Sequence, residues 1–81
     1  IVGNANYTTY PDQTKMFYED SLLEEISLKR AQMVKLIFMF YGIDEKQIRV
    51  EANGGQASVV APNDKDNWKN RRVDFFIEKN N

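Results

Sequence analysis

The sequence predicts an α/β (α+β) two-layer sandwich, in which one long helix and one short helix cover one face of a small mixed sheet. Three observations support this fold class. Apolar residues recur at helical spacing between residues 22 and 41, alternate with charged residues over 47–52, and alternate again over 73–77. An amphipathic helix and half-buried strands cover each other's apolar faces, so the order strand, helix, strand, short helix, strand indicates one two-layer domain.

The first 21 residues contain one expected strand and a long polar connection. Ile1–Ala5, "IVGNA", is typical of a short strand. Asn6–Lys15 is polar and contains Pro11, which predicts a loop. The following "MFYEDS" is compatible with either the end of that loop or the start of a helix.

The clearest element is a helix that we expect to begin at Ser21 and to end at Gly42. Ser21 and Glu24 fit a capping box, in which a hydroxyl and a carboxylate satisfy the first free N–H groups of a helix. Gly42 favours the left-handed conformation that ends many helices. The predicted length is about 20 residues, or roughly 30 Å at about 1.5 Å per residue. The expected buried stripe comprises Leu22, Leu23, Ile26, Val34, Ile37, Phe38 and Tyr41, with Phe40 outside it.

Three shorter elements are expected after Gly42. Asp44–Gln47 is typical of a single turn, and Gln47–Ala52 alternates apolar and charged residues as a half-buried strand does. Lys65–Asn70 predicts one helical turn with Trp68 pointing inward. The last element is a strand over 71–79, "RRVDFFIEK", whose residues on one side are Val73, Phe75 and Ile77.

Length and composition narrow the possible functions. The 81 residues form one domain (1–81), which we expect to be incomplete at its N-terminal side because three strands and one long helix are few elements for a sandwich. A net charge of −1 offers no basic surface for nucleic acid or for a membrane surface. His and Cys are absent, which removes thiol chemistry, disulfides and the commonest metal ligand. We therefore expect no cofactor and no metal.

Two acidic pairs, Glu19-Asp20 and Glu24-Glu25, raise the question of acid–base catalysis. Both pairs lie around the expected start of the helix, where the helix dipole favours negative charge. This placement accounts for the pairs without a catalytic role, so we expect no enzyme activity.

The run "ISLKRAQMVKLIFMFYGIDEKQIRVEANG", Ile26–Gly54, resembles the OmpA-like, peptidoglycan-associated domain family. That family has a helix of the pattern L-S-x-x-R-A-x-x-V-x-x-x-L-x-x-x-G-[IV], followed by a turn, an Ile-led strand and a Gly-containing loop. The C-terminal "NRRVDFFI", Asn70–Ile77, resembles the family's N-R-R-V-[ED]-[IF] strand. The resemblance covers most of the chain and lacks the family's first strand and helix. The helix-to-loop matches without a gap are Ser27, Arg30, Ala31, Val34, Gly42, Ile43, Ile48 and Gly54.

The resemblance implies non-catalytic binding of the peptide stem of peptidoglycan, usually through its diaminopimelate residue. A guanidinium can bind a carboxylate of that residue with two parallel hydrogen bonds. Arg30 matches the binding arginine of the family, and Asn6 falls on the aspartate of its T-D motif. Arg71 and Arg72 match paired arginines of the last strand, one of which lies near the family's site. Ser27, the serine of the L-S motif, completes the expected ligand-binding set.

The sequence departs from the family's binding motif at several positions. Asn6 carries no charge, and a charge-assisted bond contributes about 1.5–3 kcal/mol against about 0.5–1.5 for a neutral one. The exchange should therefore cost roughly 1–1.5 kcal/mol, or about tenfold in affinity. Leu23 stands where the family has an asparagine, and Ala52 and Asn53 replace the glycine and the aromatic residue of G-Y-G. The long loop offers three replacement carboxylates, Asp12, Glu19 and Asp20.

From the residues alone, the roles of the polar candidates stay open. Arg30 is either a solvated helix residue or, as its place within an apolar stripe favours, a half-buried residue that meets a partner. Because strand residues alternate between faces, we expect one of Arg71 and Arg72 to pack toward the helix and the other to be solvated. Asn6 suits a turn as well as a site.

Two functions remain in view. The first is a domain that anchors an envelope protein or complex to the cell wall. The second is a degenerate domain that serves as a structural subunit of an envelope-spanning secretion system or motor, with no ligand binding. The expected partners are the peptidoglycan peptide stem or other envelope-complex subunits, without nucleic acid, and with a membrane only through an anchor outside this sequence. The expected location is the periplasm of a Gram-negative bacterium, in association with the outer membrane or cell wall.

Overall fold

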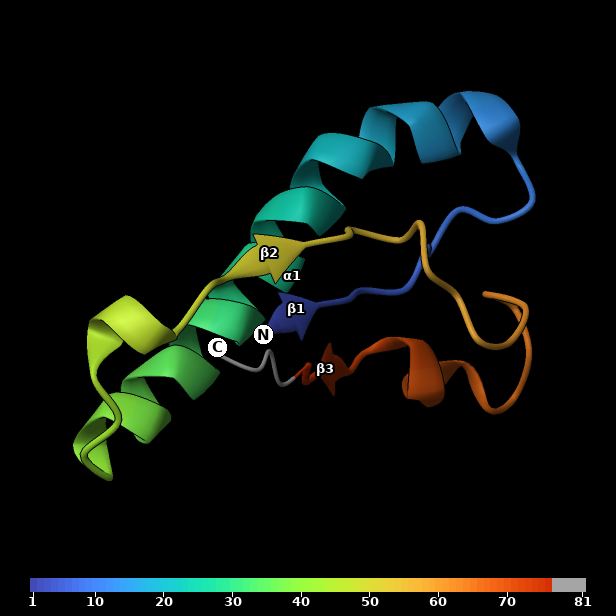
Figure 1. The fold of residues 1–81 in the computed structure, drawn as a ribbon. Coiled ribbons are helices and arrows are strands. Elements are labelled where there is room, and N and C mark those ends of the chain that lie inside the picture. Colours follow the sequence, from blue (N-terminus) through green and yellow to red (C-terminus); the bar gives the residue numbers. More distant parts are fainter. Residues whose placement is uncertain (77–81) are drawn as a thin grey trace.

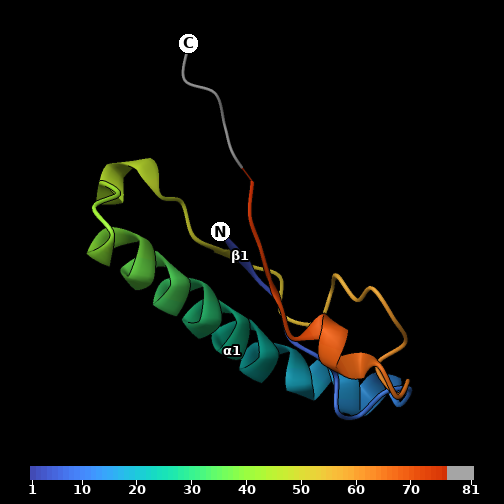
Figure 2. The same cartoon turned by 90° about the horizontal axis from the view of Figure 1, so that it is seen from below.

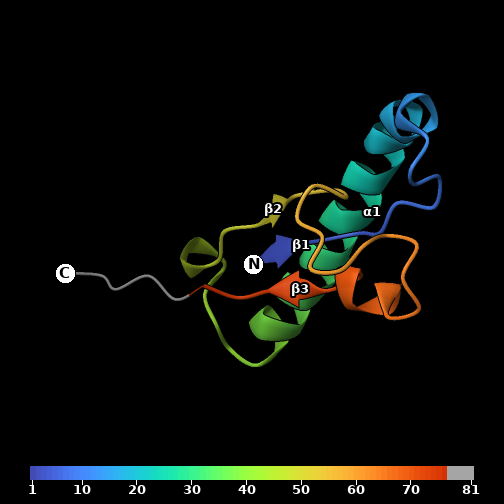
Figure 3. The ribbon, with the colours of Figure 1, turned by 90° about the vertical axis from the view of Figure 1, so that its right-hand side faces the viewer.

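The computed structural model describes residues 1–76, in which one long helix packs against a three-stranded mixed sheet (Figure 1). The central strand pairs in parallel with one neighbour and antiparallel with the other. Figure 2 shows the long helix on one side of the strands, and Figure 3 shows the order β2, β1, β3. The predicted α+β class and mixed sheet are confirmed. The elements are β1 (Val2–Gly3), α1 (Gln13–Phe40), the 3-10 helix η1 (Glu45–Gln47), β2 (Glu51–Ala52), the 3-10 helix η2 (Asn67–Asn70) and β3 (Val73–Asp74).

Helix α1 begins eight residues before the predicted cap, which corrects the assignment of Ser21 as the N-cap. The N-cap is Asp12, whose backbone is extended and whose carboxylate accepts a 3.1 Å hydrogen bond from the Lys15 N–H. Aspartate is as good an N-cap as serine. Residues 13–20 contain no glycine or proline that would oppose a helix. The helix therefore extends to 28 residues, and Ser21 lies inside it.

The C-terminal end of α1 is where the glycine predicted it. Gly42 has φ +96°, a value that favours glycine, and its N–H donates to the Met39 carbonyl at 3.0 Å. The Ile43 N–H donates to the Phe38 carbonyl at 3.1 Å. These bonds satisfy carbonyls that the end of a helix leaves free. The predicted turn follows as η1, which is capped by the Asp44 carboxylate on the Lys46 N–H at 2.9 Å.

Helix and central strand approach each other so closely that only glycine fits at position 3. A Cβ on Gly3 would lie 1.7 Å from the Ser27 carbonyl oxygen and 3.3 Å from the Ala31 Cβ. Ser27 and Ala31 are one turn apart on α1 and are fully buried. These three small residues let β1 lie directly on the helix. This contact sets the distance between α1 and the residues that follow β1.

The hydrophobic core is small and lies under the first half of α1. Ala5, Tyr7 and Leu23 form it, with Met16 and Ile26 packed against it. The strands are only two residues long, shorter than predicted, so a 28-residue helix extends beyond them. Parts of the predicted stripe are consequently uncovered. Leu22, Ile37 and Tyr41 are exposed, which corrects their assignment to the core, whereas Phe40 is exposed as predicted.

Two predictions near the C-terminus also change. Trp68 is 57% exposed rather than inward, because the buried position of η2 is taken by Asn70. Phe75 is more than half exposed, although its ring centroid lies 5.6 Å from that of Phe38. Ile77, the last inward residue of the predicted strand, lies outside the described residues. None of the helices in residues 1–76 combines the length and the apolar sequence needed to cross a membrane.

Candidate ligand site

Asn4, the residue after β1, connects the helix with both neighbouring strands. Its backbone N–H donates to the Arg72 carbonyl at 2.9 Å, and its own carbonyl accepts a 2.8 Å bond from Arg30 Nη1. Its side chain donates to Asp74 Oδ2 at 2.9 Å and accepts from Asn53 Nδ2 at 3.2 Å. Asn4 is 1% exposed. The predicted site residues Arg30 and Arg72 therefore meet at one buried residue at the end of the central strand.

Arg30 is half-buried and is held in place by its bond to Asn4. Among residues 1–76, no carboxylate oxygen lies within 4 Å of its guanidinium. A guanidinium has five N–H donors, so several remain available beyond the one that contacts Asn4. Arg30 is thus a positioned cation whose charge is not neutralised by an ion pair within the described chain.

The two C-terminal arginines differ in their surroundings. Arg72 is half-buried, and its Nε lies 3.1 Å from Asp74 Oδ1. Its Nη1 is buried and has no hydrogen-bond partner within the described part of the chain. Arg71 is exposed, and its Nη1 makes one long hydrogen bond of 3.5 Å to Asn67 Oδ1. Of this pair, only Arg72 lies next to Asn4.

Asn6 is buried, and its side chain is engaged within the protein. Its Nδ2 donates to the Tyr7 carbonyl at 2.9 Å and to the Pro62 carbonyl at 3.2 Å. Its Oδ1 accepts a 2.8 Å bond from Asn70 Nδ2. Asn6 lies two residues from Asn4, but its amide points to the loop before η2 rather than to Arg30.

Ser27 links the helix to the loop after β2. Its Oγ donates to the Glu24 carbonyl at 2.9 Å and accepts a 3.0 Å bond from the Gly54 N–H. The residue is fully buried, so its hydroxyl meets protein groups only. In this arrangement Ser27 holds the Gly54 loop against α1.

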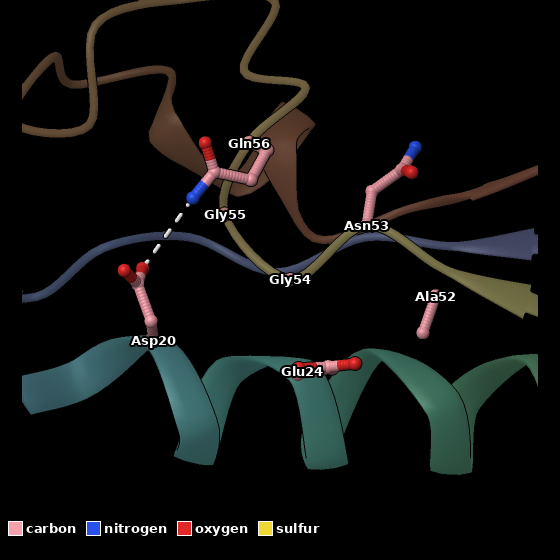
Figure 4. A pocket seen from close by; sticks show the side chains of 7 residues that line it. All are labelled: Asp20, Glu24, Ala52, Asn53, Gly54, Gly55 and Gln56. Carbon is pink, nitrogen blue, oxygen red and sulfur yellow. Dashed lines mark hydrogen bonds between the residues drawn. The ribbon is translucent and has the colours of Figure 1, made fainter. Parts of the chain in front are cut away.

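A second polar region runs along the first half of α1, which we name the Asp20 groove. It consists of two hollows of about 320 and 460 Å³ that share Asp20, Gly55 and Gln56. Figure 4 shows the Asp20 and Gln56 side chains pointing toward each other across the smaller hollow. None of the five ligand-binding residues predicted above lines either hollow. The other lining residues are Glu24, Ala52, Asn53 and Gly54 in the smaller hollow, and Tyr7, Tyr10, Gln13, Met16, Phe17, Ser58 and Pro62 in the larger.

Tyr7 organises the polar side of the Asp20 groove. Its hydroxyl donates to Asp20 Oδ1 and accepts a 2.8 Å bond from Gln56 Nε2. Burial raises the pKa of Tyr7 to about 12, with further contributions from the hydrogen bond to Asp20 and from the charge of that carboxylate. The hydroxyl consequently stays protonated and serves as a donor to Asp20.

Asp12, Glu19 and Asp20, the possible replacements for the family's aspartate, each have a different set of contacts. Asp12 caps α1. Glu19 accepts hydrogen bonds from the N–H groups and hydroxyls of Thr8 and Thr9. Burial raises the pKa of Glu19, but these hydrogen bonds outweigh burial and leave that pKa below its usual value. Asp20 alone among the three lines the groove.

The acidic pairs 19-20 and 24-25 lie inside α1, which corrects their placement at a helix start. The helix dipole therefore does not explain them, and each carboxylate has its own surroundings. Glu19 and Asp20 bond the loop before α1, Glu24 lines the Asp20 groove, and Glu25 forms an exposed ion pair of 3.1 Å with Lys29. Residues 1–76 contain no group of three or more His, Cys, Asp or Glu side chains placed to hold a metal ion.

Sequence reasoning did not identify the central roles of Asn4, Asn70, Tyr7 and Gln56. A buried asparagine looks the same in a sequence as one in a turn, so composition offers no warning. The available signal for Asn70 was its place at the head of "NRRVDFFI".

Comparisons with family models, with curated proteins and with solved structures find no match to this chain.

Proposed function

We propose that the chain is an OmpA-like, non-catalytic peptidoglycan-binding domain of a Gram-negative periplasm, which anchors an envelope protein or complex to the cell wall. In this proposal Arg30 binds a carboxylate of the peptide stem. The observation that carries it is the state of Arg30, which is half-buried, fixed on Asn4 and without a carboxylate partner among the described residues. A positioned guanidinium with free donors suits bidentate binding of a carboxylate.

Arg72 supports the same proposal in a secondary role. Its buried Nη1 lacks a hydrogen-bond partner among residues 1–76, which is unusual for a buried donor. Its charge is partly offset by Asp74, so we assign the main contact to Arg30. Asn6 contributes indirectly, by holding the strand end on which Arg30 rests.

The test is a calorimetric or NMR titration of the chain with a sugar-free stem peptide that contains diaminopimelate. Arg30→Gln should weaken binding by about tenfold or more, because a charge-assisted contact is lost. Arg71→Gln is the matched control, since Arg71 is exposed and makes one long contact to Asn67. A folded chain that shows no response to millimolar peptide, or equal losses in both variants, would contradict the proposal.

A second candidate function is that of a structural subunit of an envelope-spanning secretion system or motor, without ligand binding. The observation that favours it concerns Asn6, which falls on the family's aspartate position. Its side-chain amide is already hydrogen-bonded to groups of the protein itself. The exposed apolar residues Met33 and Phe40 on α1 also suit a protein interface. Cross-links from these two positions to another envelope subunit, combined with no response to stem peptide, would establish this function instead.

A further inference from the structure

The Asp20 groove has the chemistry of a ligand site that is separate from Arg30. We infer that it binds a short uncharged saccharide, held by hydrogen bonds to Asp20 and Gln56 and by stacking on Phe17. This inference does not rest on the peptide-stem proposal, because Arg30 does not line the groove.

The polar side of the groove presents planar hydrogen-bonding groups with unused capacity. Asp20 Oδ1 accepts from Tyr7, while Asp20 Oδ2 makes no hydrogen bond among the described residues. Gln56 Nε2 donates to the Tyr7 hydroxyl at 2.8 Å and to Asp20 Oδ1 at 3.5 Å, while the Gln56 carbonyl oxygen is unbonded within residues 1–76. The unused groups are therefore two acceptor oxygens, one from a carboxylate and one from an amide. They match adjacent sugar hydroxyls, each of which can donate a hydrogen bond.

Exposed aromatic rings also line the larger hollow of the groove. Phe17 is 72% exposed and Tyr10 is 37% exposed, and both line the larger hollow. The C–H groups on one face of a sugar ring form an apolar surface that packs on such a ring, whose face carries partial negative charge. The hollow of about 460 Å³ lies within the size range of small-molecule sites, roughly 300–1,000 Å³. A ring available for stacking together with planar polar groups fits a sugar better than a purely apolar ligand.

The charges around the groove select against anions. Asp20 and Glu24 line it, and no Lys or Arg of residues 1–76 does. Phosphates, nucleotides and free carboxylates would meet like charge there. A cationic side chain is the competing ligand class. The saccharide is favoured because Asp20 already acts as an acceptor within a network of uncharged donors from Tyr7 and Gln56.

The walls of the groove are held in place by contacts within the protein. Tyr7 is 7% exposed and packs against Gly55, where an added Cβ would lie 2.5 Å from the Tyr7 ring. The Gly54 N–H is fixed on Ser27. Because these groups are held by contacts within the protein, binding loses less conformational freedom than it would in a flexible loop.

The experiment is an NMR titration of the isotope-labelled chain with uncharged trisaccharides of glucose and of N-acetylglucosamine. We expect saturable shifts at the Gly54 and Gly55 amides and at the Gln56 side-chain amide, with a Kd on the order of 1 mM. Phe17→Ala should raise that Kd about three- to tenfold through the loss of stacking. Phe40→Ala is the matched control, because Phe40 is also an exposed phenylalanine on α1, is 84% exposed and lines neither hollow.

Two further titrations distinguish saccharide binding in the groove from peptide-stem binding at Arg30 and from binding of a cationic ligand. Arg30→Gln should leave saccharide binding within about twofold of the original while weakening the sugar-free stem peptide, so each proposal can fail alone. The inference is overturned if neither trisaccharide gives shifts at concentrations on the order of 10 mM, or if Phe17→Ala and Phe40→Ala behave alike. Shifts at the same amides with a lysine-containing peptide, and none with sugar, would assign the groove to cationic ligands instead.

Discussion

Asn70 Nδ2 donates a 2.8 Å hydrogen bond to Asn6 Oδ1 and so joins two buried side chains that are 64 residues apart in the chain. Asn70 also bonds the loop before η2. Its Oδ1 accepts from the Val59 N–H at 2.8 Å and the Val60 N–H at 3.2 Å, and its Nδ2 donates to the Val60 carbonyl at 3.0 Å. One amide therefore satisfies four polar groups and fixes that loop beside the end of β1.

Replacing Asn70 should destabilise the protein strongly. Asn70→Ala leaves the buried Asn6 Oδ1 and the part-buried N–H groups of Val59 and Val60 without their partner. A buried unsatisfied group costs about 1–3 kcal/mol, and a partly solvated group costs less. We expect a loss of about 3 kcal/mol or more in the free energy of unfolding, measured by urea denaturation. Asn63→Ala, an exposed position in the same loop, should change it by less than about 0.5 kcal/mol. Similar midpoints for the two variants would show that the Asn70 network is unimportant.

A methyl group at position 3 should separate the helix from the central strand. The Cβ of Gly3→Ala would lie 1.7 Å from the Ser27 carbonyl oxygen, which is backbone and cannot rotate away. We expect a loss of at least about 3 kcal/mol, at the upper end for overpacking, seen as a large drop in thermal midpoint. Gly42→Ala meets no atom within 4 Å and should cost only the backbone strain of φ +96°, about 1–2 kcal/mol. Equal effects would mean that β1 can move off α1 cheaply.

The helix shows which features a local pattern can predict. Its C-terminal end was predictable because Gly42 alone supplies the required φ. Its start was not, because Asp12 and Ser21 are both good caps. The choice between them depends on Glu19, which bonds Thr8 and Thr9 only if residues 13–20 are helical. The residues of a helix cap do not show in the sequence whether Glu19 contacts the loop before the helix.

The sequence predicted the residue types of the candidate site better than the directions in which their side chains point. The place of Arg30 within an apolar stripe indicated a half-buried residue with a partner, and its bond to the Asn4 carbonyl agrees with that. The side chain of Asn6 points away from Arg30, because Asn70 and Pro62 offer it buried partners. Those partners are 56 and 64 residues away in the chain, so no local spacing reveals them. The Asp20 groove likewise needs the 53–58 loop to lie on α1.

The hydroxyl of Tyr7 should make stability fall at alkaline pH. The pKa of Tyr7 is about 12 in the folded protein and about 10 when exposed. A raised pKa means that the stabilisation is fully present below about pH 10 and is lost as the pH rises toward 12. Tyr7→Phe removes this dependence and should cost about 1 kcal/mol at neutral pH, because Asp20 loses a donor. Ultraviolet titration of the tyrosines checks this, and one fewer high-pKa phenol is expected in the variant.

The carboxylate of Glu19 should make the stability of the fold decrease at acid pH. Its pKa is lowered in the folded state, so its stabilisation is present above the ordinary value of 4.5 and is lost as the pH falls through the folded pKa. Protonation weakens the bonds to Thr8 and Thr9 and releases the loop before α1. Glu19→Gln should therefore be less stable than the original chain at pH 7 and should approach it below about pH 4.

The matched control for Glu19 is Glu25→Gln, which breaks the exposed ion pair with Lys29 on the same helix. Exposed pairs of this kind contribute little, so this variant should differ from the original chain by less than about 0.5 kcal/mol at pH 7. Denaturation midpoints between pH 3 and pH 7 measure both variants. A gap between Glu19→Gln and the original chain that stays constant over this range would show that Glu19 acts through packing. Loss of the gap on acidification would tie the start of α1, eight residues before Ser21, to the charge on one carboxylate.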